Sequence, residues 1–168
     1  IRLWLMAALT VLPMALQAED TRSLKQAVGD RFLMGVGTSP RILANPADAA
    51  LVKRHFQILT PDNCKKPEAV QPSEGKWNFK AADGFADFAR NHGLQVTGHA
   101  LVWAKDDRTS DWMMQENGAP VSRETLLKRI ETHVTTVAKR YADVATHWDV
   151  VNEAVADQGE NFLRDSIY

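Results

Sequence analysis

An amide and a carboxyl side chain stand side by side at the end of an apolar run. Asn152 and Glu153 follow residues 148–151, which include two consecutive valines. We expect this run to be a buried strand that delivers both polar groups to its carboxyl end. A carboxyl group there can protonate a departing oxygen, and the amide can bond a hydroxyl without changing charge. The pair therefore suits the cleavage of a glycosidic bond.

Polar side chains also close two other apolar runs. Asp62 and Asn63 follow residues 58–59, and His99 and Trp103 lie within or just after residues 94–102. Each has an ordinary structural explanation, namely a turn or a core side chain. Their recurrence at equivalent positions favours a shared site. Sugar rings pack their C–H faces on indole, and the candidates are Trp77, Trp103, Trp112 and Trp148, of which we expect Trp77 and Trp148 to lie in the core.

A metal site is the alternative for the last run. His147, Asp149 and Glu153 point to one face of an extended segment. His147 and Glu153 are six residues apart, however, which is roughly 20 Å along a strand, so they cannot bind one ion. Cys64 is the single cysteine and has no CxxC pattern around it. We therefore expect neither a metal nor another cofactor.

The elements that position these groups alternate along the chain. Strands are predicted at residues 32–36, 58–59, 94–102 and 148–151, and helices at 47–56, 81–92 and from Ser122 to Tyr141. The first helix would turn Leu51, Val52 and His55 inward. Gly93 is expected to end the second helix in a left-handed conformation. Ser122 is expected to cap the third.

Alternating strands and helices predict an α/β fold with parallel strands. Both the open doubly wound sheet and the closed eight-stranded barrel fit this order. The stretch from Gly35 to Gly37 lacks the third glycine of a dinucleotide-binding turn, which argues against the first. In either architecture the chemistry gathers at the carboxyl ends of the strands.

Composition narrows the possible partners and location. The 168 residues are 45% hydrophobic and 24% charged, with a net charge of −1. These values exclude a disordered chain and give no support for nucleic-acid binding. Residues 1–18 run from Arg2 through an apolar stretch to Ala18, which is the order of a secretory signal peptide. The stretch is shorter than the ~20 residues of a spanning helix, so a secreted or periplasmic protein without stable membrane association is expected, with an uncleaved anchor as the alternative.

Several motifs together resemble one enzyme family. Gly98-His99-Ala100-Leu101-Val102-Trp103, Ser110-Asp111-Trp112 and the segment 148–154 are similar to the third- and fourth-strand signatures of endo-1,4-β-xylanases of glycoside hydrolase family 10. The resemblance implies a (β/α)8 TIM barrel that cleaves xylan with retention and without a metal. It also implies roles for six residues: Glu153 as general acid/base, Asn152 on the sugar 2-hydroxyl, and Asn63, Lys66, His99 and Trp103 along the glycone side of the cleft.

The chain departs from the family pattern in places. Pro67 stands where many members have Trp, Asp62 where Glu is usual, and Ala104-Lys105-Asp106 follows Trp103. The family takes its nucleophile from the seventh strand, whereas this chain holds about four strand-helix units. We therefore expect residues 1–18 to be a signal and 19–168 to be the N-terminal part of the barrel, with the nucleophile outside it. The alternatives are another retaining glycosidase, acting on mannan or cellulose, and a non-catalytic glycan-binding half-barrel.

Overall fold

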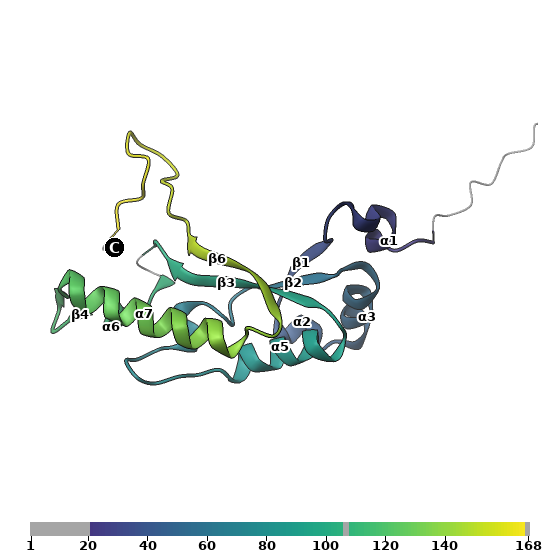
Figure 1. Cartoon of the computed structure of the whole chain (residues 1–168), viewed down its shortest axis with the longest axis horizontal. Coiled ribbons are helices and arrows are strands. Elements are labelled where there is room, and N and C mark those ends of the chain that lie inside the picture. Colours follow the sequence, from purple (N-terminus) through teal and green to yellow (C-terminus); the bar gives the residue numbers. More distant parts are fainter. Residues whose placement is uncertain (1–20, 106–107, 167–168) are drawn as a thin grey trace, which may run out of the picture.

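Four parallel strands form the centre of the protein. The computed structural model describes residues 21–105 and 108–166, and the predicted signal peptide at residues 1–18 lies outside these ranges. The sheet runs in the order β1 (Gly35–Thr38), β2 (Ile58–Pro61), β3 (Gln95–Trp103) and β6 (Ala145–Asn152). Each strand pairs in parallel with its neighbour, and helices occupy the connections (Figure 1). The α/β prediction is confirmed.

The helices lie between the strands in the chain. Their bounds are α1 (Leu24–Val28), the 3-10 turn η1 (Gly29–Arg31), α2 (Pro40–Leu43), α3 (Pro46–His55), α4 (Pro67–Val70), α5 (Lys80–Asn91), α6 (Asp111–Met114) and α7 (Arg123–Arg140). A short antiparallel hairpin of β4 (Gln115–Glu116) and β5 (Ala119–Pro120) precedes α7. None of the helices in the described ranges combines the length and apolarity needed to cross a membrane.

Local sequence explains where the two longest helices begin and end. The Ser122 hydroxyl accepts a hydrogen bond from the Thr125 amide at 3.1 Å and so caps α7, as predicted. Gly93 follows α5 with φ +63°, also as predicted. Phe85 and Ala89 of α5 and Val137 of α7 are buried against the sheet. Burial of these apolar faces holds both helices on one side of the strands.

A close approach of backbone and indole joins β3 to β6. Gly98 is paired with Trp148 in register. A Cβ at position 98 would lie 2.1 Å from Trp148 Cε3, far inside van der Waals contact. Only glycine leaves room for the indole to pack on the core at this point. Trp77 and Trp148 are both partly buried against the core, as expected.

Two predictions about the amino-terminal elements were wrong. The first strand begins at Gly35 instead of residue 32, because pairing with β2 starts at Gly35 and Ile58 and Phe32 is left 57% exposed before it. In α3 the inward residues are Ala49 and Val52. Leu51 is 55% exposed, because α3 packs mainly on α1 and α2 and these helices leave Leu51 uncovered.

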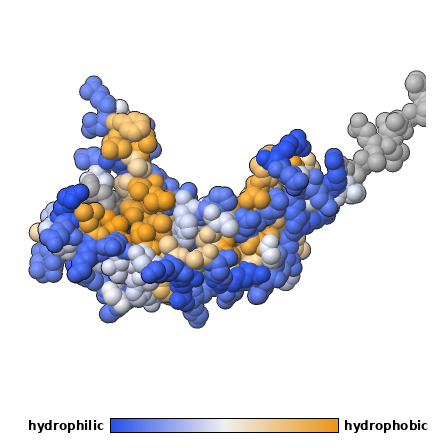
Figure 2. Space-filling view, viewed as in Figure 1, coloured by the Kyte–Doolittle hydropathy of each residue, from blue (hydrophilic) through white to orange (hydrophobic). Residues whose placement is uncertain are grey.

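The expectation that residues 148–151 form a buried strand was also wrong. β6 is longer than predicted and is the last strand of the sheet formed by the described residues. Val150 and Val151 point to opposite faces, yet they are 58% and 51% exposed. Figure 2 shows an apolar patch around this end of β6 and the segment that follows it, where the exposed large apolar residues are Val150, Val151, Val155, Phe162 and Leu163.

Candidate active site

The carboxyl ends of β2, β3 and β6 bring together the predicted site residues. After β2, the Lys66 ammonium donates to Asn63 Oδ1 at 2.6 Å, and Asn63 Nδ2 donates to Asp62 Oδ2 at 3.1 Å. Pro67 starts α4 immediately afterwards and fixes the turn that presents Lys66. The asparagine and the lysine therefore act as one hydrogen-bonded unit, while the Asn63 side chain stays exposed to solvent.

Aromatic contacts connect this unit to β3. Lys66 Nζ lies 4.7 Å from the ring centre of Trp103, and the His99 and Trp103 rings meet edge to face at 5.0 Å. Trp103 is only 5% exposed, and its Nε1 has no hydrogen-bond partner in the described part of the chain. The β3–β6 register shifts between His99 and Val102. Such irregularities re-aim side chains next to functional sites.

Strand β6 adds the remaining residues through its register with β3. His99 pairs with Asp149, and Trp103 pairs with Asn152. The Ala104 amide donates to the Asn152 carbonyl at 2.9 Å, which fixes the two strand ends side by side. The chain then leaves the strand at Glu153, whose φ is +54°. The positive φ marks a sharp change of direction at the predicted acid/base residue.

Sequence reasoning did not foresee the partners of two predicted site residues, namely Asp149 for His99 and Arg164 for Glu153. The His99 imidazole donates through Nδ1 to Asp149 Oδ2 at 2.7 Å, which fixes the ring orientation. Arg164 donates through Nε to the Glu153 carbonyl at 2.9 Å, and its Nη2 lies 3.8 Å from Glu153 Oε2. Spacing along the sequence does not reveal the first pair, because the β3–β6 register shifts between His99 and Val102 and so pairs Trp103 with Asn152.

The arrangement offers an acid beside hydrogen-bonding groups and an aromatic ring. The Glu153 side chain is 39% exposed and so is accessible to a ligand from outside. Asn63, Lys66, His99 and Asn152 can bond hydroxyls, and Trp103 adds an apolar surface. No group of three or more potential metal ligands occurs among residues 21–105 and 108–166.

Comparison with known proteins identifies the family. The sequence model described as "Glycosyl hydrolase family 10" matches residues 23–168. The chain belongs to this family. An endo-1,4-beta-xylanase/feruloyl esterase from Xylanibacter ruminicola is 42% identical over 140 residues, which are 83% of this chain and 19% of that protein. Endo-1,4-beta-xylanase B from Paenibacillus barcinonensis is 37% identical over 145 residues, or 86% of this chain and 42% of that protein.

Solved structures agree with the sequence comparison. A psychrophilic endo-beta-1,4-xylanase of glycoside hydrolase family 10 superposes with a TM-score of 0.82 at 37% identity. The match covers 87% of this chain and 46% of that structure. This chain of 168 residues thus spans less than half the length of these relatives. Its four-stranded parallel sheet is part of the (β/α)8 barrel of the family.

Proposed function

We propose that this chain supplies the acid/base half of an endo-1,4-β-xylanase active site. The observation that carries the proposal is the in-register pairing of Trp103 with Asn152, which puts Glu153 at the same sheet edge as the Lys66–Asn63 unit. The relatives named as endo-1,4-beta-xylanases support xylan as the substrate. No nucleic acid, metal or cofactor takes part in the proposed reaction.

Glu153 is the proposed general acid/base. In the first step its carboxyl proton passes to the glycosidic oxygen as the bond to the anomeric carbon breaks, and a second carboxylate attacks that carbon. In the second step Glu153 takes a proton from water, and the hydroxide oxygen displaces the enzyme carboxylate with retention. Asn152 is assigned to the sugar 2-hydroxyl. Asn63, Lys66, His99 and Trp103 are assigned to the glycone side.

The second carboxylate is proposed to come from outside these 168 residues. Retention requires two carboxyl groups about 5 to 5.5 Å apart. Asp62, Asp106, Asp149 and Glu160 do not occupy the motif position of the family nucleophile, and Asp149 is already bonded to His99. The greater length of the relatives supports a further segment that carries the nucleophile.

Residues 1–18 are proposed to direct export, and residues 19–168 to form the first part of the barrel. Export would place the enzyme outside the cytoplasm, as a secreted or periplasmic protein. The order of Arg2, the apolar stretch and Ala18 supports this location.

Replacement of Glu153 tests the proposal in the full-length protein that the gene for this chain encodes. We expect Glu153→Ala to lower kcat on xylan about 10²- to 10⁴-fold, the usual contribution of a general acid. On an aryl xylobioside with an acidic phenol leaving group, the variant should lose far less activity in the first step, because the departing phenolate oxygen needs no proton. Added azide should restore turnover by replacing the activated water.

The matched control is Glu160→Ala, a carboxylate seven residues further along an exposed segment. It should leave all three measurements unchanged. Full activity of Glu153→Ala on xylan would refute the role of Glu153. Turnover of mannan or cellulose in preference to xylan, with a chelator present, would refute the substrate. Binding of xylan by the wild type without any turnover would refute the enzymatic function.

A further inference from the structure

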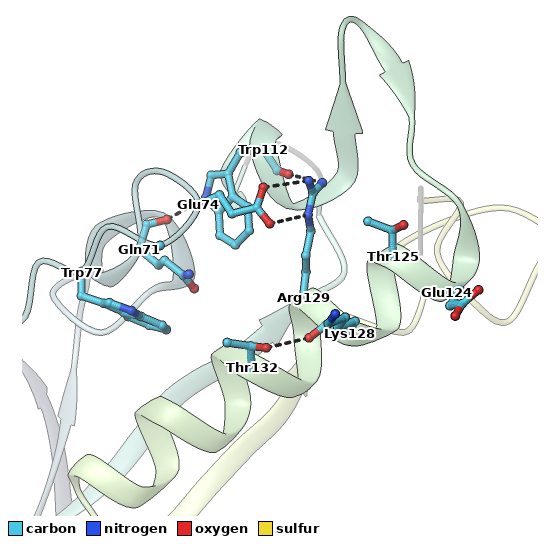
Figure 3. A pocket seen from close by; sticks show the side chains of 10 residues that line it. Gln71, Glu74, Trp77, Trp112, Glu124, Thr125, Lys128, Arg129 and Thr132 are labelled. Atoms are coloured by element: carbon cyan, nitrogen blue, oxygen red, sulfur yellow. Dashed lines mark hydrogen bonds and ion pairs between the residues drawn. The ribbon is translucent and has the colours of Figure 1, made fainter.

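A pocket of about 520 Å³ lies outside the proposed cleft. Its walls come from the 71–77 loop, α6 and the first half of α7 (Figure 3). None of the six candidate active-site residues lines it. Its volume lies within the range of small-molecule sites. It therefore needs an explanation separate from the glycosidic chemistry at Glu153.

Charged and polar bonds fix the walls of this pocket. The Arg129 guanidinium donates to Glu74 through Nε at 3.1 Å and Nη2 at 2.8 Å, and through Nη1 to the Trp112 carbonyl at 2.6 Å. The Arg129 side chain is only 10% exposed. Trp112 Nε1 in turn donates to the Gln71 carbonyl at 2.9 Å. A site held in this way loses little conformational freedom when a ligand binds.

Polar side chains and two indoles, those of Trp77 and Trp112, line the same space. Gln71 is 3% exposed, and its Oε1 accepts from His133 Nδ1 at 2.8 Å. Figure 3 shows the Gln71 amide and the Trp77 ring on one wall, opposite Arg129, Lys128 and Thr132 on α7. In the described part of the chain, the Lys128 ammonium has neither a hydrogen bond nor an ion pair.

The charges of the lining favour a neutral ligand. Glu74 neutralises Arg129 by direct contact, and the remaining charged residues, Glu124 and Lys128, have opposite signs. Neither an anion nor a cation would therefore be preferred. Indole surface together with amide, ammonium and hydroxyl groups suits a ring with apolar C–H groups and several hydroxyls. A neutral sugar has this chemistry.

We propose that this pocket is a second carbohydrate site, which holds neutral xylose units of a xylan chain away from the bond that is cut. The choice of xylose rests on the proposed function, but the site does not need Glu153 or a nucleophile. Residues 109–112 link the pocket to the cleft, since the Thr109 hydroxyl donates to the Trp103 carbonyl at 3.3 Å while Ser110 and Trp112 both donate to the Gln71 carbonyl. A bound chain would thereby be retained near the cleft between successive cuts.

Calorimetric titration of the full-length Glu153→Gln protein with xylotetraose tests the proposal. Thr132 lines the pocket, and its hydroxyl donates only to the Lys128 carbonyl of its own helix, so Thr132→Trp should fill the pocket without breaking a tertiary contact. Thr136→Trp is the matched control, because Thr136 makes the same bond to Thr132 and does not line the pocket. We expect the Glu153→Gln protein to bind xylotetraose at two sites. Adding Thr132→Trp should leave one site, and adding Thr136→Trp should leave both.

A milder substitution keeps the test valid if Thr132→Trp misfolds. Lys128→Ala should weaken the pocket site about tenfold, the effect of one hydrogen bond to a charged group. It should leave kcat on a small aryl xyloside unchanged. A single site that neither Thr132→Trp nor Lys128→Ala affects would overturn the proposal, as would no binding at all. A single site abolished by Thr132→Trp, in a protein whose wild type does not cleave xylan, would support the pocket and refute the proposed function alone.

Discussion

The buried histidine of α7 makes stability depend on pH in a defined window. His133 is 1% exposed, stacks on Trp77 with ring centres 5.8 Å apart, and donates through Nδ1 to Gln71 Oε1. Its Nε2 has no partner among the described residues. Burial lowers the pKa of His133 from 6.5 to about 4, because a charged imidazolium would lose its hydration there.

The size of the effect follows from proton linkage. Between pH 6.5 and about 4 the unfolded chain binds a proton at His133 and the folded chain does not. The free energy of unfolding therefore falls as the pH is lowered through this window. Above pH 6.5 His133 is mostly neutral in both the folded and the unfolded chain, so its protonation costs little stability there. Between pH 7 and pH 5 the loss from this one group amounts to about 2 kcal/mol.

His133→Gln removes the titration while an amide can still bond Gln71. We expect urea unfolding of the full-length protein to show a smaller loss of stability between pH 7 and pH 5 for this variant, by about 2 kcal/mol. His92→Gln, which changes an exposed histidine at the C-cap of α5, should retain the wild-type pH dependence. Equal pH dependence in wild type and His133→Gln would refute the reasoning, whatever the absolute stabilities are.

Two further substitutions test other contacts. Gly98→Ala should destabilise the protein by about 1–3 kcal/mol, because its Cβ would lie 2.1 Å from Trp148 Cε3. The control Gly37→Ala, whose Cβ meets nothing within 4 Å, should cost much less. Similar urea midpoints for the two variants would contradict this. Arg164→Ala should lower kcat on xylan roughly 10- to 100-fold by releasing the Glu153 backbone. As a positioning effect, it should lower turnover of an aryl xyloside with an acidic leaving group much less, and Arg164→Lys should recover part of the loss; equal losses on both substrates would refute it.

Local signals in the sequence predicted the regular elements well. Ser122 and Gly93 mark helix ends through bonds and dihedral angles that involve only neighbouring residues, and both predictions are confirmed. The apolar residues around Phe32 and Leu51 misled the assignments, since apolar side chains also occur on the surface and the pattern does not say what covers them.

The candidate site, like the fold, was predictable where neighbouring residues carry the signal and unpredictable where distant segments meet. Asn63 and Trp103 could be found because polar groups recur at the ends of successive apolar runs, whereas Lys66 was implied only by the family resemblance. The structure brings all three into contact. The bond from His99 to Asp149 joins residues 50 positions apart and depends on the strand register. The pocket at Gln71 could not be foreseen, because it forms between a loop and a helix that no periodicity relates.

The uncovered end of β6 has a consequence for how the protein is made. Val150 and Val151 place one accessible apolar side chain on each face at this end of the strand, and its outer edge offers unpaired backbone groups in the described structure. During synthesis such a strand is a template on which another nascent chain can add its own strand. Yield of folded protein should therefore fall as the expression rate rises, and chaperones that shield apolar segments should restore it.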